Sequence, residues 1–588
     1  MKSSALCWCI CLLQLLPLFM PAVLAAPAAT LEYSVTGIEG DLRKNVRAYL
    51  GAAPQNEQDR LNFVASAKGK VRDALQALGY YSPEIAIDLQ RTEPLWSMQV
   101  TVEPGEPVHI RDIDIQLLGQ AANDETMLAL VAGSGLVAGE ALHHGRFEDF
   151  RKKLLSTGQQ RGYLDGEITR SRVEVQVEAG TADILIRYDS GARFRFGAVR
   201  YDEALISPAL VDALLTFETG EYYDQSQLRK FQSNLQATNY FSSVIVQPLR
   251  EDALGDQVPI EVTLHAAKRH TFEVGVGYST DTEGRVSMTW RTPKINRYGH
   301  SQVTRVEYSP VNPSGRFTYS IPVTNPLNDV AQLWARLEEN EYGDIKSRQM
   351  ESGARREIKD GKWIYSYALR GLNESWDDLY SSLSNNYLLP GASLSSREHS
   401  GALVDPKGGF NQLYTLEGGN KQLGSDIDLL RMTAEWRYIA TPWPRHRLVT
   451  RAEVGAVETA DGDRNNLAPS LSFFAGGSQS IRGYAYQSLG HEETVIQPDG
   501  TTRRLVVGGN RLAIASGEYQ YYFTDTWRGA LFVDAGDAFD EGNFDTKVGA
   551  GFGVHYITPV GAVRVELANS VSEENPDWYF HLTIGAEF

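Results

Sequence analysis

Residues 578–588 read WYFHLTIGAEF, and this stretch alternates strictly between two kinds of side chain. Successive residues of a β-strand point to opposite faces, so the alternation predicts a strand with two chemically different surfaces. One surface is apolar and carries Trp578, Phe580, Leu582, Ile584, Ala586 and Phe588. The other is small or polar and carries Tyr579, His581, Thr583, Gly585 and Glu587. Such a strand, ending on an aromatic residue, is typical of a transmembrane barrel with lipid outside and a wet lumen inside.

The same alternation runs back along the chain through residues 266–588. It recurs in Phe272–Tyr278 and in Trp363–Arg370, with polar and glycine-rich turns between such stretches. A soluble antiparallel sheet also alternates, so the period alone leaves both classes open. Aromatic residues near the strand ends, and charges such as Arg564 and Glu566 on the opposite face, favour a membrane barrel. At about 20 residues per strand and connection, the region gives room for roughly 16 antiparallel strands.

Residues 1–25 have the composition of a secretory signal peptide. Lys2 precedes the apolar stretch Ala5–Phe19, and small residues follow it. This order predicts export, with cleavage after Ala25 or Ala26. A retained membrane anchor is the alternative interpretation, but the apolar stretch is short for that role.

Cysteine content and net charge further limit the class of protein to which the chain can belong. The only cysteines, Cys7, Cys9 and Cys11, lie inside the predicted signal peptide, so the mature chain can form no disulfide or thiolate site. A formal net charge of −18 argues against nucleic acid as a partner. No apolar run of about 18 residues follows the signal peptide, so we expect no transmembrane helix. An exported chain of this kind is either soluble or spans a membrane as a closed barrel.

Between the signal peptide and the alternating region, the chain repeats itself three times. Gly79, Gly162 and Asn239 each end a helical pattern where a left-handed cap can form, and a tyrosine and a strand-like run follow each. The repeats predict three β-α-α-β-β modules, whereas one large α+β domain is the alternative. The predicted boundaries are 26–106, 107–190 and 191–265 for the modules and 266–588 for the barrel.

The most specific motif is Ile481-Arg482-Gly483-Tyr484. It resembles the (V/I)RG(F/Y) motif that the outer-membrane assembly superfamily carries on a long loop after the eleventh barrel strand. That superfamily includes BamA, TamA and the two-partner secretion translocators, and its POTRA modules resemble the three repeats. Three modules, rather than five or two, indicate the TamA type.

The resemblance also implies a role for the loop arginine. In the superfamily the loop folds back into the barrel, where its arginine pairs with carboxylates of the inner wall. Glu518 and Asp534 match those positions, and alternation places both on the lumenal face. A guanidinium can bind a carboxylate through two parallel hydrogen bonds, and Gly483 would let the loop approach the wall. The alternative is that Arg482 is an ordinary loop arginine and the carboxylates merely solvate a channel.

The pairing of the first and last strands is the predicted site of action. The first runs from about Arg269 to Tyr278, and the last is 578–588. Glycine lowers the order of both strands, so we expect a lateral seam that opens and templates an incoming strand by β-augmentation. The predicted seam residues are Phe272, Val274, Gly275, Val276, Gly277, Phe580, Leu582, Ile584, Gly585 and Phe588.

The resemblance implies an assembly factor of the Gram-negative outer membrane, with its modules in the periplasm. The implied partners are the lipid bilayer, unfolded barrel and autotransporter clients, and a TamB-like inner-membrane protein that meets the N-terminal module. Lipid transport through that partner is an alternative role.

Two other classes compete with this interpretation. An outer-membrane hydrolase is disfavoured because the sequence contains no G-x-S-x-G or H-E-x-x-H, and His555 and His581 lie on different strands without a partner motif. We therefore predict no catalytic residue, metal or cofactor. A two-partner exporter or passive pore usually has two modules and an N-terminal plug helix, whereas Leu31–Ile38 reads as a strand.

Deletion of Phe588 should impair insertion of the protein into the membrane. The terminal aromatic residue lies on the predicted lipid face and resembles the superfamily's recognition signal. The amount of heat-modifiable barrel in outer-membrane fractions measures the effect. Normal levels after the deletion would contradict the prediction.

Overall fold

The computed structural model describes residues 30–377, 382–496, 502–559 and 561–585. The predicted signal peptide and Phe588 therefore lie outside the described residues. The chain divides into two compact units, one made mainly of the first two modules and one made of most of the third module and the barrel.

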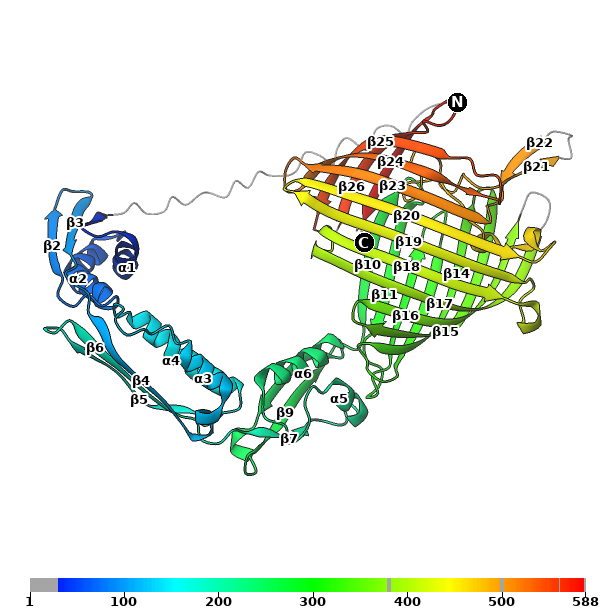
Figure 1. The fold of residues 1–588 in the computed structure, drawn as a ribbon. Coiled ribbons are helices and arrows are strands. Elements are labelled where there is room, and N and C mark those ends of the chain that lie inside the picture. The colour runs from blue at the N-terminus through cyan, green and yellow to red at the C-terminus, as the bar shows by residue number, and fades with distance from the viewer. Residues whose placement is uncertain (1–29, 378–381, 497–501, 560, 586–588) are drawn as a thin grey trace. The chain divides into compact units, whose positions relative to one another are not determined.

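Three modules with the predicted β-α-α-β-β order precede the barrel along the chain (Figure 1). The first contains β1 (Leu31–Thr36), α1 (Gly40–Leu50), α2 (Glu57–Gln76), β2 (Glu84–Gln90) and β3 (Trp96–Glu103). The second contains β4 (His109–Leu118), α3 (Glu125–Ala132), α4 (His144–Gln160), β5 (Glu167–Gln176) and β6 (Thr181–Asp189). The third contains β7 (Arg195–Arg200), α5 (Pro208–Leu214), α6 (Gln225–Ala237), β8 (Phe241–Pro248) and β9 (Gln257–Ala266).

Each module folds around a sheet whose last strand in the chain lies in the centre, in the orders β1-β3-β2, β4-β6-β5 and β7-β9-β8. In the first module β3 runs parallel to β1 and antiparallel to β2. Its alternate residues Met98, Val100 and Val102 are fully buried, and they share a core with Ala67 and Val71 of α2. The predicted left-handed positions are confirmed, with φ of 92° at Gly79, 92° at Gly162 and 59° at Asn239.

Asp124 joins the start of α3 to the end of α4 in the second module. Its carboxylate accepts hydrogen bonds from the backbone N–H groups of Thr126 (2.9 Å) and Met127 (3.2 Å). It also accepts from Arg161 Nε at 2.9 Å and from the Tyr163 hydroxyl at 3.0 Å. Burial would raise the pKa of Asp124, but these hydrogen bonds outweigh burial and hold that pKa below its usual value.

We expect Asp124→Asn to destabilise the second module by about 1–3 kcal/mol, because the amide cannot replace the charge that Arg161 binds. A carboxyl with a lowered folded pKa stabilises the fold above its unfolded pKa, and this stabilisation is lost as the pH falls through the folded pKa. The difference between wild type and variant should therefore shrink below about pH 4. Hydrogen exchange of the α3 amides in the full-length protein measures it, and a difference independent of pH would contradict the argument.

The third module is bonded directly to turns of the barrel. Tyr240 Oη donates to the carbonyl of Gly299 at 2.9 Å, and Asn325 Nδ2 donates to the carbonyl of Ala213 at 2.6 Å. Gly299 has φ of 77°, and a Cβ there would lie 2.7 Å from the Tyr240 hydroxyl. The glycine therefore permits the close approach of the module to the barrel turn.

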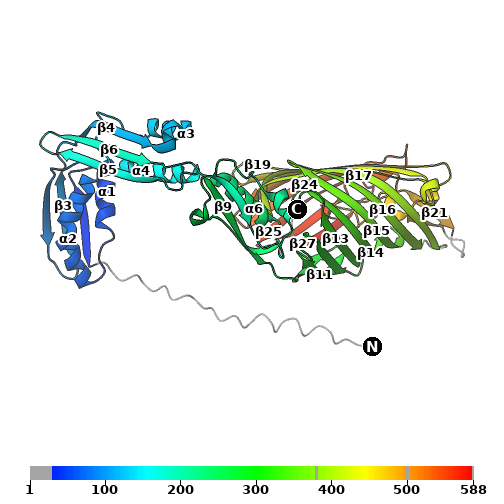
Figure 2. The ribbon, with the colours of Figure 1, turned by 90° about the horizontal axis from the view of Figure 1, so that it is seen from below.

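Sixteen antiparallel strands form one closed barrel, as predicted. Figure 2 shows β13 to β17 side by side in chain order. The strands are β10 (Thr271–Ser279), β11 (Glu283–Thr292), β12 (Ser301–Tyr308), β13 (Ser314–Pro322), β14 (Asp329–Tyr342), β15 (Ile345–Asp360), β16 (Trp363–Asp377), β17 (Ser382–Ala402), β18 (Asp405–Gly419), β19 (Leu429–Trp443), β20 (His446–Thr459), β23 (Arg511–Tyr522), β24 (Trp527–Phe539), β25 (Lys547–Thr558), β26 (Gly561–Asn569) and β27 (Trp578–Gly585). A separate hairpin of β21 (Glu492–Ile496) and β22 (Thr502–Val506) belongs to the connection between β20 and β23.

The outer face of the barrel is apolar and solvent-exposed, as a lipid-facing surface requires. Val274, Val276 and Leu531 are 73%, 81% and 61% exposed. No helix among the described residues is both long and apolar enough to cross a membrane.

Residues 467–489, in the connection between β20 and β23, pack inside the barrel; we call them the lumenal loop. It buries Leu471, Phe473 and Ile481 against wall residues such as Leu389. The prediction of a small and polar inner face is therefore wrong for this part of the lumen, because the loop supplies apolar partners that the strand pattern does not contain.

Candidate functional site: the lumenal arginine and the barrel seam

Arg482 lies at the point where the lumenal loop meets the wall formed by β23 to β27. Its guanidinium binds Asp534 of β24 through two hydrogen bonds, Nε at 2.7 Å and Nη2 at 3.0 Å. Its backbone N–H donates to the same carboxylate at 3.0 Å. Arg482 is 2% exposed and the Asp534 side chain is fully buried, so little water screens the pair.

Two further carboxylates surround the same guanidinium. Arg482 Nη1 lies 2.7 Å from Glu518 of β23 and 3.1 Å from Glu566 of β26. The aromatic ring of Phe532 lies 3.4 Å from the guanidinium carbon, in a cation–π arrangement. One cation thus ties the loop to three strands of the wall.

A second arginine reduces the negative charge of this cluster. Arg451 of β20 lies 3.7 Å from Asp534, and its Nη1 donates to the carbonyl of Gln479 in the loop at 2.5 Å. Arg451 therefore binds both the loop and the wall, so the loop is anchored from β20 as well.

Glycine permits the close contact between loop and wall. A Cβ on Gly549 of β25 would lie 1.6 Å from the carbonyl oxygen of Arg482, and such an overlap is impossible without moving the loop. Gly483 has φ of 96°, and a Cβ there would lie 3.0 Å from the Asn569 backbone. The loop reaches its position only because both residues lack a side chain.

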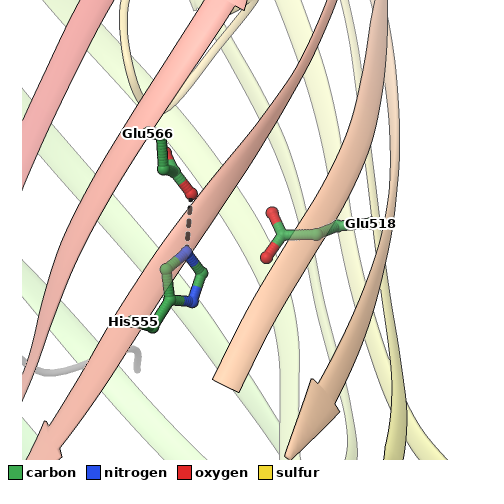
Figure 3. A group of neighbouring side chains, drawn as sticks. All are labelled: Glu518, His555 and Glu566. Atoms are coloured by element: carbon green, nitrogen blue, oxygen red, sulfur yellow. Dashed lines mark hydrogen bonds and ion pairs between the residues drawn. The ribbon is translucent and has the colours of Figure 1, made fainter. Parts of the chain in front are cut away.

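His555 completes the cluster as a neutral hydrogen-bond donor. Its Nδ1 accepts from Arg528 at 3.2 Å, so in the neutral ring Nε2 carries the proton and donates to Glu566 at 3.0 Å. Figure 3 shows the imidazole of β25 turned toward Glu566 of β26, with Glu518 facing the pair from β23.

Glu518, His555 and Glu566 offer ligand atoms within 4.8 Å of one another, which is a spacing that a metal ion could use. However, Arg482 Nη1 contacts both carboxylates, and the His555 nitrogen that faces Glu566 carries a proton. Arg482 therefore supplies the positive charge that a metal ion would bring to these carboxylates, and we assign no metal to the three residues.

The first and last strands pair with each other at the seam. Among the described residues, which end at Gly585, β10 and β27 pair at Tyr278 with Ile584 and at Ser279 with Thr583, and the N–H of Thr280 donates to the Leu582 carbonyl at 3.1 Å. On its other side β27 pairs with β26 from Ala562–Gly585 to Asn569–Trp578. The seam residues predicted from the sequence lie as follows: Phe272, Val274, Gly275, Val276 and Gly277 in the part of β10 before Tyr278, Phe580 and Leu582 in β27 before Thr583, and Ile584 and Gly585 at the end of β27.

The structure brings Arg482 together with Glu518 and Asp534, and it places Ile481 and Tyr484 in the buried part of the loop. Sequence reasoning missed Glu566, Arg451 and Gly549 as members of the cluster. Glu566 had been noted as a lumenal charge, but alternation shows only which face a residue occupies, whereas the strand register decides which charges meet. The sequence shows no partner motif for His581, and in the structure its Nε2 accepts from the Gly483 N–H at 3.3 Å.

The fold and the site define a class: a closed antiparallel barrel behind three small α/β modules, with a loop anchored in the lumen. Residues 396–588 match the family described as Omp85 superfamily domain, and residues 32–104 match POTRA domain TamA domain 1. These two matches together fit a TamA/BamA-type member of that superfamily.

Known proteins resemble this chain in sequence or in structure. The outer membrane protein assembly factor BamA of Neisseria meningitidis is 25% identical over 165 residues, which is 26% of this chain and 21% of that protein. The match thus spans about a fifth of the relative's length. The crystal structure of BamA from Haemophilus ducreyi lacking POTRA domains 1–3 covers 81% of this chain and 99% of its own, with a TM-score of 0.71 and 15% identity. CdiB from Acinetobacter baumannii covers 93% and 99%, with a TM-score of 0.45 and 13% identity.

Arg482→Ala should leave a folded barrel with a released loop and lower resistance to heat. Removing one partner of a buried ion pair costs about 3–5 kcal/mol, and water entering the lumen reduces that figure. Arg482→Lys should restore only part of the lost heat resistance, because an ammonium cannot form two parallel hydrogen bonds to Asp534 while also contacting Glu518. The temperature of heat-modifiability on gels measures both variants.

A double-mutant cycle with Asp534→Asn tests whether the two residues act as a pair. The double variant should lose less heat resistance than the sum of the single variants. Strict additivity would mean that Arg482 and Asp534 do not interact energetically.

Proposed function

We propose that the protein inserts or secretes β-barrel and autotransporter proteins at the Gram-negative outer membrane, through a lateral seam between β10 and β27. The single observation that carries this proposal is that the first and last strands, β10 and β27, close the barrel by pairing with each other, at Tyr278–Ile584 and Ser279–Thr583 among the described residues. The name of the Neisseria relative, an outer membrane protein assembly factor, supports the same role.

Tyr278 of β10 pairs with Ile584 of β27, and Ser279 pairs with Thr583. On its other side β10 bonds to β11 over its whole length, from Thr271–Arg291 to Ser279–Glu283. If the seam opens, the edge of β10 that faces β27 is released and can template an incoming strand by β-augmentation.

The free energy for this reaction would come from folding of the client. We find no nucleotide-binding motif in the sequence, and an incoming strand gains backbone hydrogen bonds that it lacks while unfolded in lipid. The TamA-type first module supports a TamB-like inner-membrane partner, which we place at that module. The modules themselves would lie in the periplasm and guide clients to the barrel.

The lumenal loop argues against a passive pore as the alternative. A pore needs a wet path, whereas this loop buries apolar residues within the lumen and is fixed by Arg482. A hydrolase is also disfavoured. The Ser478 hydroxyl bonds to Asp281 rather than to a histidine, and His581 uses Nε2 to hold the loop backbone.

A disulfide across the seam should block assembly reversibly. Tyr278→Cys with Ile584→Cys places the two thiols at paired positions, and ladder partners have Cα separations suited to a disulfide. The Val274 and Leu582 positions suggested by the strand pattern are not partners in this register, because the Leu582 carbonyl accepts from the N–H of Thr280. Loss of client assembly on oxidation and its recovery on reduction are the expected results.

The matched control is Leu337→Cys with Met350→Cys, a paired and exposed position in the ladder between β14 and β15. This disulfide should leave assembly intact, because that ladder has no reason to open. Full assembly with the seam disulfide complete would rule out lateral opening.

A further inference from the structure

Asp281 lies in the turn between β10 and β11, where the first hairpin of the barrel meets the lumenal loop. Its carboxylate accepts two hydrogen bonds from Ser478 of the loop, one from the backbone N–H at 2.8 Å and one from the hydroxyl at 2.6 Å. The Asp281 side chain is 9% exposed and Ser478 is 6% exposed. Bonds to a carboxylate in so enclosed a position are stronger than neutral ones.

The backbone of the loop is shaped for this contact. Gly477 has φ of 99°, and a Cβ there would lie 3.1 Å from the Asp281 oxygen that Ser478 binds. A larger residue at position 477 would both strain the backbone and crowd the carboxylate.

The same loop is bonded to the other side of the seam. The N–H of Gly483 donates to Nε2 of His581 in β27 at 3.3 Å. In the neutral ring Nδ1 then carries the proton, and this atom lies 3.9 Å from Asp281 with no hydrogen-bond partner among the described residues. His581 is 3% exposed, so Asp281 and His581 form a buried polar pair between the first hairpin and the last strand.

We propose that Asp281, Ser478 and His581 form a seam latch, through which the lumenal loop holds the first hairpin against the last strand. Asp281 is a positioning residue: it fixes β10 beside β27 by binding the loop that β27 also binds. The loop bonds to both edges of the seam, to the turn between β10 and β11 through Ser478 and to β27 through Gly483, so it contributes to the closure. Release of Ser478 by Asp281 would free the hairpin while Arg482 keeps the loop on the wall formed by β23, β24 and β26.

The latch rests on the proposed function in one respect, because both take the seam between β10 and β27 as the place where the barrel opens. Its test measures seam closure directly, as the rate of disulfide formation between Tyr278→Cys and Ile584→Cys in membranes. We expect Asp281→Ala to slow this reaction by about tenfold, because charge-assisted hydrogen bonds shift a two-state equilibrium by roughly that factor. Ser478→Ala should have a smaller effect, since the backbone N–H of residue 478 still donates.

The control is Glu283→Gln, which removes an exposed carboxylate from the same hairpin and should leave the rate unchanged. Disulfide formation between Leu337→Cys and Met350→Cys in the Asp281→Ala background shows whether the barrel as a whole is intact. An unchanged seam rate in Asp281→Ala, or an equal loss in Glu283→Gln, would overturn the latch.

Client assembly, measured separately, distinguishes the latch from the proposed function. Loss of assembly in Asp281→Ala with normal seam closure counts against the latch and leaves lateral opening standing. A slower seam rate together with assembly through a fully crosslinked seam supports the latch and overturns lateral opening.

Discussion

A strand that faces lipid must have its backbone N–H and C=O groups paired within the protein, because no water is present there to replace a missing partner. This chain meets the requirement by joining β10 to β27 in one closed barrel. Among the described residues this junction is made by the pairs Tyr278–Ile584 and Ser279–Thr583. The lumenal loop bonds to both sides of the junction, through Ser478 to Asp281 and through Gly483 to His581.

Arg482 fixes the loop through charge rather than through shape alone. Three carboxylates, from Asp534, Glu518 and Glu566, converge on one guanidinium. Any of these acids left alone in an enclosed wall would be costly, so the cation stabilises the wall as much as the loop. Removing the arginine thus affects two structures at once, which is why its loss should lower the stability of the barrel as well as free the loop.

The alternating pattern in the sequence was sufficient to predict the barrel, and the internal repeats were sufficient to predict the three modules. The pattern in 578–588 corresponds to β27, and the left-handed caps at Gly79, Gly162 and Asn239 lie where a helix ends before a tyrosine. The cluster around Arg482 could be predicted only in part, because alternation gives the face of a residue while register gives its neighbours. Nothing in the sequence connects Gly549 with the loop. Its role depends on the contact with Arg482, which precedes it by more than sixty residues in the chain.

Glycines have different roles at the seam and in the loop. Gly275 and Gly277 carry no side chain with which β10 could pack, whereas Gly483 and Gly549 allow the loop backbone to touch the wall. Opening of the seam exposes backbone groups before a client strand arrives to pair with them. Contacts of the loop with both edges of the seam can therefore shift the balance between the closed and open states. On the proposed function, the residues that set this balance are those that join the loop to both edges of the seam.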